Sequence, residues 1–303
     1  MELKFTQEEF YQFIDHRKIG LSQKSHDWIN RAAYTTWKHT QGIISREVLT
    51  GFRDFILSKY SSRDSYIKSV GLLRSFLKYL TKTRMDTRFA AFDIFLEPPK
   101  IKKDRKTITT RVVTIDDIKY VLNVIDENER VGELDHDRAM HHRTFILIGA
   151  YSGQRPGSTL AKITIGQIRA ALAMEKPCIH VLSSQDKIRM EHWVPLHPEL
   201  IRSLNAVIDG RSDGEPVFNF NLIQLWLKRN PIGLKRCNSK FTASHLRKFA
   251  EQYGDIIQWD HSNRAYILTH GVSGVDWAHY KHPLSEYVYD VYMQYWGSVN
   301  ISV

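Results

Sequence analysis

Residues 241–249 read Phe-Thr-Ala-Ser-His-Leu-Arg-Lys-Phe, and this stretch decides how the second half of the chain is expected to fold. Leu246, Phe249 and Tyr253 repeat at the spacing of one buried helix face, and Thr242 is suited to cap that helix. Arg247 and Lys248 fall near the helix start, where backbone N–H groups and the helix dipole already favour an anion such as phosphate. Cations lose dipole energy there, so the pair indicates a site built for negative charge, unless the helix simply has a solvated basic face.

A second stretch places another arginine at a helix junction. Apolar residues run from 145 to 150, and residues 151–156 read Tyr-Ser-Gly-Gln-Arg-Pro. Ser152 and Gly153 are expected to end the first helix, and Pro156 suits the first turn of the next one. Arg155 is therefore left at the junction, where an arginine seldom serves packing alone.

A third stretch predicts a β-hairpin. Residues 179–182 and 192–196 have the composition of two strands, and Gln185-Asp-Lys187 lies between them. Lys187 is thus expected near a turn, where a lysine is by default solvated.

In chain order the sequence offers Arg155, Lys187, Arg247, His270 and Tyr280. This order and spacing resemble the tyrosine recombinases, the family of phage and archaeal integrases and Xer proteins. Arg155 resembles the arginine of the family's T-G-x-R-x-x-E box. Lys187 resembles its hairpin lysine, and Arg247 the arginine of its H-x-L-R-H box. His270 stands near the family's G-H histidine, and Tyr280 follows Arg247 by 33 residues, near the family's nucleophile.

The resemblance implies a DNA recombinase or integrase that cleaves and rejoins DNA through a 3′-phosphotyrosyl intermediate at Tyr280. Arg155 and Arg247 would clamp the non-bridging phosphate oxygens, because guanidinium groups bind phosphate bidentately. Lys187 would protonate the leaving 5′ oxygen, and His270 would donate a hydrogen bond to the phosphate. No metal and no other cofactor is implied. The implied partners are double-stranded DNA and further copies of the chain, as a dimer or tetramer on that DNA.

Some positions depart from the family pattern. Ser244 stands where the family's second box has a histidine, and His245 is displaced from that position by one residue. Ser158 stands where the first box has an acidic residue, and the final L-G-H reads Leu-Thr-His at 268–270. The general base is therefore open among His245, Ser244, His279 and water. Tyrosines at 287, 289, 292 and 295 compete with Tyr280 for the role of nucleophile.

The composition is that of an ordinary globular protein of 303 residues, with 42% hydrophobic and 25% charged residues. No apolar stretch approaches the length of a membrane span, and the N-terminus lacks the apolar core of a signal peptide. Two cysteines, Cys178 and Cys237, do not make a disulfide framework, which favours a reducing compartment such as the cytoplasm. The pairs His141-His142 and His279/His282 lack further ligands at zinc spacing, so they are expected at the surface or facing phosphate.

The positive charge is concentrated in the first third of the chain. Residues 1–110 carry 21 Lys and Arg against 12 Asp and Glu, whereas residues 111–303 carry 22 against 21. A basic part beside a near-neutral part indicates a polyanionic partner for the first. Pro98-Pro99 and the basic run after them predict a linker. The expected division is a helical, DNA-binding core-binding domain at 1–95, a basic linker at 96–110 and an α+β catalytic domain at 111–303.

Periodic apolar residues predict four helices in the first domain, and the whole chain is expected to be mostly α-helical with one small β-hairpin or sheet. The residues expected on DNA are Arg74, Lys78 and Lys82 in one row of the fourth helix, Lys100, Lys102 and Lys103 in the linker, and Lys235, Arg236, Lys240 and Lys248 around residues 241–249.

Two other functions compete with this interpretation. A non-catalytic DNA-binding regulator with a diverged recombinase fold would explain the changed histidine. A type IB topoisomerase shares the chemistry, but its larger enclosing domain has no obvious room in 303 residues.

Overall fold

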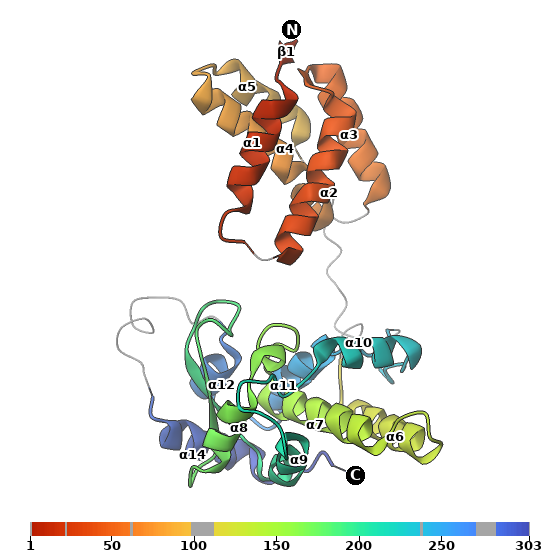
Figure 1. Ribbon diagram of the computed structural model, residues 1–303, viewed down its shortest axis with the longest axis vertical. Coiled ribbons are helices and arrows are strands. Elements are labelled where there is room, and N and C mark those ends of the chain that lie inside the picture. Colours follow the sequence, from red (N-terminus) through yellow and green to blue (C-terminus); the bar gives the residue numbers. More distant parts are fainter. Residues whose placement is uncertain are drawn as a thin grey trace. The chain divides into compact units, whose positions relative to one another are not determined.

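The computed structural model describes residues 2–21, 23–60, 63–97, 112–236, 239–270 and 283–302. The chain divides into two compact units, residues 1–105 and 106–303 (Figure 1). The linker lysines Lys100, Lys102 and Lys103 lie outside the described residues.

The first unit is a helical bundle with a very small sheet. β1 (Leu3–Lys4) pairs antiparallel with β2 (Ile43–Ile44), with Leu3 opposite Ile44. The helices are α1 (Gln7–Lys18), α2 (Gln23–Thr40), α3 (Arg46–Lys59), α4 (Arg63–Thr83) and the short α5 (Arg88–Ala91), which continues into the 3-10 helix η1 (Phe92–Leu96). The four predicted helices are confirmed, whereas the sequence did not predict β1, β2, α5 or η1.

Local signals account for the helix starts of this unit. Thr6 and Glu9 form a reciprocal capping box at the start of α1, as the sequence predicts. Ser45 caps α3 by accepting a hydrogen bond from Val48 N–H. Phe76 of α4 lies at the centre of the core, with ring centroids 4.9 Å from both Phe5 and Phe10. These aromatic contacts hold the bundle together.

The predicted row of three cations on α4 is reduced to two by the fold. Arg74 donates to Asp93 of η1 through Nε (2.6 Å) and Nη2 (2.5 Å), and this hydrogen bonding raises the pKa of its guanidinium further. Lys78 and Lys82 are exposed. Arg74 therefore joins α4 to η1 inside the unit, and only the two lysines present uncompensated charge along this row.

The second unit is mostly helical around one β-hairpin. Its helices are α6 (Ile115–Arg130), α7 (His136–Ser152), η3 (Leu160–Lys162), α8 (Ile165–Leu172), α9 (Pro198–Ile208), α10 (Phe220–Arg229), α11 (Ser244–Ile256), α12 (His261–Leu268) and α14 (Ser285–Trp296). β3 (Cys178–Val181) and β4 (His192–Pro195) pair antiparallel, with Ile179 opposite Val194. The predicted hairpin is thereby confirmed.

Helix α7 forms the middle of the second unit. Residues 144–152 are buried without interruption, and α6, α9 and α11 all pack against α7 (Figure 1). A helix that is buried on all sides has no polar face, which explains the continuous apolar run. Residues 299–301 cover the last turn of α7: the Tyr151 hydroxyl donates to Glu199 Oε2, lies 3.1 Å from the Val299 carbonyl oxygen and accepts from Ile301 N–H (3.0 Å).

Three expectations for the second unit are wrong. The acidic composition of residues 126–137 favours a loop, but α6 continues to Arg130 and Asp135 caps α7 by accepting from Arg138 N–H. No α-helix begins at Pro156; a turn leads into η3, with Thr159 N–H bonded to the Arg155 carbonyl. The pair His141-His142 is not at the surface as a pair, because only His141 is half-exposed. His142 is buried, its Nδ1 lies 3.2 Å from Nδ1 of His141, and burial lowers both pKa values to about 4.

No helix in the described ranges is long and apolar enough to cross a bilayer.

Candidate active site

Arg155 is positioned by the two residues that precede it. Gly153 ends α7 in the left-handed conformation (φ 62°), and a Cβ there would overlap Leu268 and Ala250. Gln154 is fully buried and donates from Nε2 to the Ile267 carbonyl (2.6 Å). The end of α7 is thus fixed against α12, and the direction of the Arg155 side chain is set with it.

Arg155 is the first cation of the site. Its Nη1 donates to Asp186 Oδ1 (2.9 Å) and to Thr269 Oγ1 (2.8 Å), and its side chain is 19% exposed. Asp186 comes from the hairpin loop, and Thr269 follows α12. One guanidinium therefore links three segments that are far apart in the sequence.

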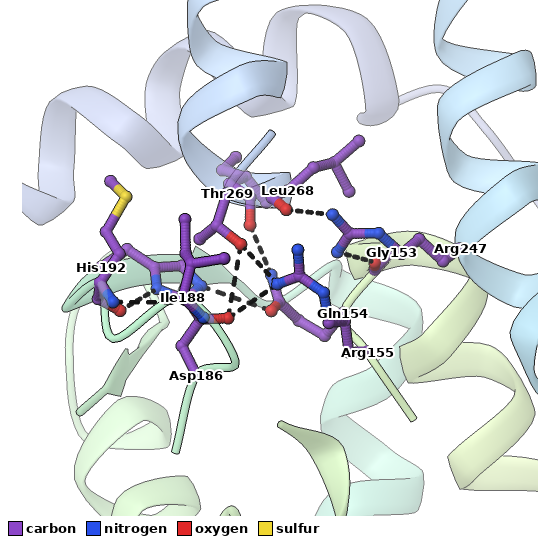
Figure 2. A network of polar contacts seen from close by, with 11 residues as sticks. Gly153, Gln154, Arg155, Asp186, Ile188, His192, Arg247, Leu268 and Thr269 are labelled. Carbon is purple, nitrogen blue, oxygen red and sulfur yellow. Dashed lines mark hydrogen bonds and ion pairs between the residues drawn. The ribbon is translucent and has the colours of Figure 1, made fainter. Parts of the chain in front are cut away.

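Arg247 is the second cation, and it lies in the first turn of α11. Its Nη1 donates to the Gly153 carbonyl (3.1 Å) and its Nη2 to the Leu268 carbonyl. Burial, followed by the nearby charge of Arg155, lowers the pKa of Arg247 to about 10, although Glu251 and Asp186 oppose that shift. Figure 2 shows Arg155 between Asp186 and Thr269 on one side and Arg247 on the other. Two neighbouring, partly buried cations concentrate positive charge at a position suited to an anion.

His270 lies beside this pair of arginines, directly after Thr269. Its Nδ1 is 3.3 Å from Glu251 Oε1 on α11. Burial, and then the positive charge of Arg247, lowers the pKa of His270. Because the Glu251 carboxylate accepts from Nδ1–H, Nε2 of the neutral ring carries no hydrogen, and a hydrogen bond from Nε2 to a phosphate requires the protonated imidazolium.

Lys187 lies in the loop that joins β3 to β4, and its side chain is exposed. The neighbour Asp186 is buried, and its Oδ2 accepts from Ile188 N–H (2.9 Å). The loop is therefore pinned beside Arg155 while the lysine points to solvent. The structure thus brings Arg155, Arg247 and His270 together and holds the lysine loop against them.

The geometry of His245 argues against its use as a base. His245 is buried, and its Nδ1 accepts from Thr242 N–H at 2.9 Å, with Thr242 Oγ1 at 3.1 Å. With Nδ1 accepting, the neutral ring carries its proton on Nε2, so neither nitrogen is free to take another. The helix starts after Ala243, and this contact replaces the predicted Thr242 cap. Ser244 is exposed, with Oγ 2.9 Å from Thr242 Oγ1.

The remaining predicted residues lie elsewhere. Lys235, Arg236 and Lys240 are exposed on the segment before α11, and Lys248 is half-buried on α11. Tyr280 and His279 lie outside the described residues. Among the residues that the structure describes, no group of three or more His, Cys, Asp or Glu is arranged to hold a metal ion.

The sequence did not predict four further side chains of this network: Gln154, Asp186, His192 and Thr269. His192 is buried with Nε2 3.3 Å from Gln154 Oε1, so it supports the junction from β4. The one available signal was the position of Asp186 and Thr269 next to Lys187 and His270. Their burial depends on long-range packing, which no local pattern encodes.

Gly153→Ala is expected to destabilise the second unit by about 2–5 kcal/mol, from left-handed strain and overlap with Leu268 and Ala250. The loss should appear as a fall in melting temperature of about 5–15 °C. Gly210→Ala is the matched control, because Gly210 also has positive φ (66°) but an added Cβ meets nothing within 4 Å. Equal losses in the two variants would show that the contact with α12 contributes nothing.

No protein-family model matches the sequence, and no curated protein is similar enough to it in sequence to count as a match. Solved structures do match. A lambda integrase dimer bound to a COC′ core site aligns with a TM-score of 0.59 and 12% identity over 93% of this chain and 78% of that one. The lambda integrase tetramer bound to a Holliday junction gives a TM-score of 0.60 at 13% identity, over 90% of this chain and 78% of that chain.

A third match is the Tn1549 transposon integrase in complex with transposon right end DNA. It aligns with a TM-score of 0.61 and 14% identity over 95% of this chain and 98% of that chain. At sequence identities this low, the structural similarity shows a shared fold and not a shared chemical activity. The two arginines and the histidine, placed by the ends of α7, α11 and α12, belong to a chain with the tyrosine recombinase fold.

Proposed function

We propose that this protein is a site-specific DNA recombinase or integrase that cleaves and rejoins DNA through a 3′-phosphotyrosyl intermediate. The observation that carries the proposal is the convergence of Arg155, Arg247 and His270 in one partly buried cluster of cationic and polar groups. This cluster can neutralise a phosphate, and His270 precedes Tyr280 by ten residues. A nucleophile and an anion site are therefore close in the chain.

Transesterification needs a nucleophile, neutralisation of the phosphate and a proton for the leaving oxygen. The Tyr280 hydroxyl oxygen would attack the phosphorus, and the bond from phosphorus to the 5′ oxygen would break. Arg155 and Arg247 would stabilise the charge that builds on the non-bridging oxygens. Lys187 would give its proton to the departing 5′ oxygen, and rejoining would reverse each transfer.

The acceptor of the tyrosine proton is the least determined part of the proposal. His245 is occupied by its contact with Thr242, which favours Ser244, His279 or a water molecule for that role. The proposed chemistry needs no metal because the two guanidinium groups supply the positive charge.

The proposed partner is double-stranded DNA, with further copies of the chain assembled on it in the cytoplasm. The support is that the matching lambda integrase structures are a dimer on a core site and a tetramer on a Holliday junction. A non-catalytic DNA-binding regulator is the second candidate, favoured by Ser244 and Ser158 at positions where the related enzymes carry histidine and an acid.

Covalent attachment to DNA separates the two candidates. The substrate is a pool of nicked duplexes of randomised sequence, in which the short fragment beyond the break diffuses away after cleavage. With EDTA present, a recombinase should form protein–DNA adducts that survive denaturing electrophoresis, and peptide mapping should place the DNA on a tyrosine. Retardation of the same duplexes in native gels without any adduct would favour the regulator.

The double substitution of Lys78 and Lys82 by alanine is expected to weaken binding to all duplexes alike. If each lysine neutralises one phosphate, the slope of log K against log salt should become less steep by about 2. Lys176→Ala is the matched control, because the Lys176 ammonium is already paired with Asp290 at 2.6 Å. A slope unchanged by the double substitution would remove this face of α4 from the DNA interface.

A further inference from the structure

We propose that Asp186 and Thr269 act together as positioning residues, which hold Arg155, the Lys187 loop and His270 in one arrangement around a single phosphate. The proposal deepens the function proposed above and rests on it. Neither side chain is expected to touch the reacting atoms, because both are directed to Arg155 and to the backbone around it (Figure 2).

Asp186 is a fully buried carboxylate whose contacts all lead to the site. Oδ1 accepts from Arg155 Nη1 (2.9 Å) and lies 3.4 Å from Thr269 Oγ1. Oδ2 accepts from the backbone N–H groups of Ile188 (2.9 Å) and Met190 (3.5 Å). A buried carboxylate needs such partners, and here Asp186 directly precedes Lys187 while its two backbone donors follow the lysine. The carboxylate therefore fixes the lysine loop relative to the first arginine.

Ser158 explains why Arg155 needs a carboxylate from another segment of the chain. An acid three residues after Arg155 would have come from the same turn as the arginine, but this chain has a serine there. The carboxylate on Arg155 comes instead from the loop that carries the lysine. This ion pair thus has two roles. It orients the Arg155 guanidinium, and it fixes the position of Lys187 relative to that guanidinium.

Thr269 is held in a backbone conformation that its side chain disfavours. Its φ of 50° and ψ of 44° are left-handed, which is a genuine outlier for a β-branched residue. Glycine would adopt this conformation without strain. The hydroxyl is the polar group that glycine lacks, and it accepts from Arg155 Nη1 at 2.8 Å. Thr269 is 2% exposed and directly precedes His270. The contact with Arg155 therefore also fixes the backbone position of His270.

Four substitutions separate positioning from simple stability. Thr269→Ser keeps the hydroxyl, Thr269→Val keeps the β-branch without it, and Thr269→Gly removes both the hydroxyl and the strain. Asp186→Asn keeps the shape of the side chain and removes its charge. Each is compared with the full-length wild type in single-turnover cleavage of the nicked substrate, and each is melted in the absence of DNA.

The expected rates follow the hydroxyl and the carboxylate. Thr269→Gly, Thr269→Val and Asp186→Asn should each lose about a hundred-fold in cleavage rate, as a misplaced catalytic group does, while Thr269→Ser stays within about threefold of wild type. The expected melting temperatures follow the backbone instead, with Thr269→Gly above Thr269→Val. The proposal would be overturned if the cleavage rates followed the melting temperatures, so that Thr269→Gly cleaved like wild type and Thr269→Val did not.

A second readout does not depend on cleavage. Inorganic phosphate should raise the melting temperature of wild type and Thr269→Ser relative to equal ionic strength of chloride, and should raise that of Thr269→Gly and Asp186→Asn by less than half as much. If wild type forms no covalent adduct but keeps this pattern, the recombinase function fails and the anion site remains. If wild type cleaves and all four variants match it in both readouts, the positioning role alone fails.

Discussion

Arg247→Ala is expected to lower the rate of DNA cleavage by about a thousand-fold or more, while affinity for DNA changes by only a few-fold. The guanidinium lies partly buried beside Arg155, and burial with that neighbouring charge lowers its pKa to about 10. The protonated guanidinium is destabilised by burial and by Arg155, so an entering phosphate stabilises it. This stabilisation grows as negative charge builds on the phosphate. Its contribution should therefore be largest in the transition state, where the charge on the non-bridging oxygens is greatest.

The measurement is single-turnover cleavage of a nicked duplex, with binding measured separately at the same salt concentration. Arg247 also donates to the carbonyls of Gly153 and Leu268, so the melting temperature of the variant must be compared with that of wild type. Arg247→Lys tests the bidentate geometry, since it keeps the charge and loses the planar fork. Arg130→Ala is the matched control, because Arg130 is 72% exposed and paired with Glu127 on α6. Equal losses of binding and cleavage in Arg247→Ala would identify Arg247 as a docking residue.

Tyr280→Phe is expected to abolish the covalent protein–DNA adduct altogether and to leave DNA binding intact. No other group on the same side chain can form the phosphotyrosyl bond, so the loss is complete and not partial. The structure supports this choice among the tyrosines by removing one rival. Tyr292 is fully buried and donates to the Tyr151 carbonyl at 3.2 Å, and burial raises its pKa well above 10.

Three controls complete this experiment. Tyr287 is 64% exposed on α14, so Tyr287→Phe should cleave like wild type. Tyr289 is half-buried and burial raises its pKa, so Tyr289→Phe should do the same. Tyr295 lies on the same helix and completes the set. An adduct that persists in Tyr280→Phe and disappears in one of the other three would transfer the role of nucleophile to that residue.

Local signals in the sequence predicted much of the fold. The capping box of Thr6 with Glu9, the end of α7 at Gly153 and the strand composition of β3 and β4 each depend on residues a few positions apart. They could therefore be read without knowledge of the tertiary structure. The prediction of a helix at Pro156 was wrong because a turn that contains this proline also provides hydrogen bonds for the backbone. Tertiary packing decides between the helix and the turn.

The candidate site divides in the same way. Arg155 and Arg247 could be identified because their positions at a helix junction and a helix start are local, and the structure brings them together. The pairing of Arg74 with Asp93 spans 19 residues, and that of Arg155 with Asp186 spans 31. The tertiary structure determines which residues form such pairs. Neither the row of cations on α4 nor the carboxylate in the hairpin loop indicates its partner in the sequence. The catalytic roles themselves remain predictions for the experiments above.

The contacts of Tyr151 with Val299 and Ile301 matter for anyone who produces this protein. Residues 299 and 301 are buried, and they cover the last turn of the helix that leads to Arg155. A shortened chain that ends at Gly297 would leave the Tyr151 hydroxyl with its Glu199 contact but without these two, and would expose the last turn of α7 to water. Such a chain is expected to cleave DNA more slowly than the full chain, although it keeps every candidate residue of the site.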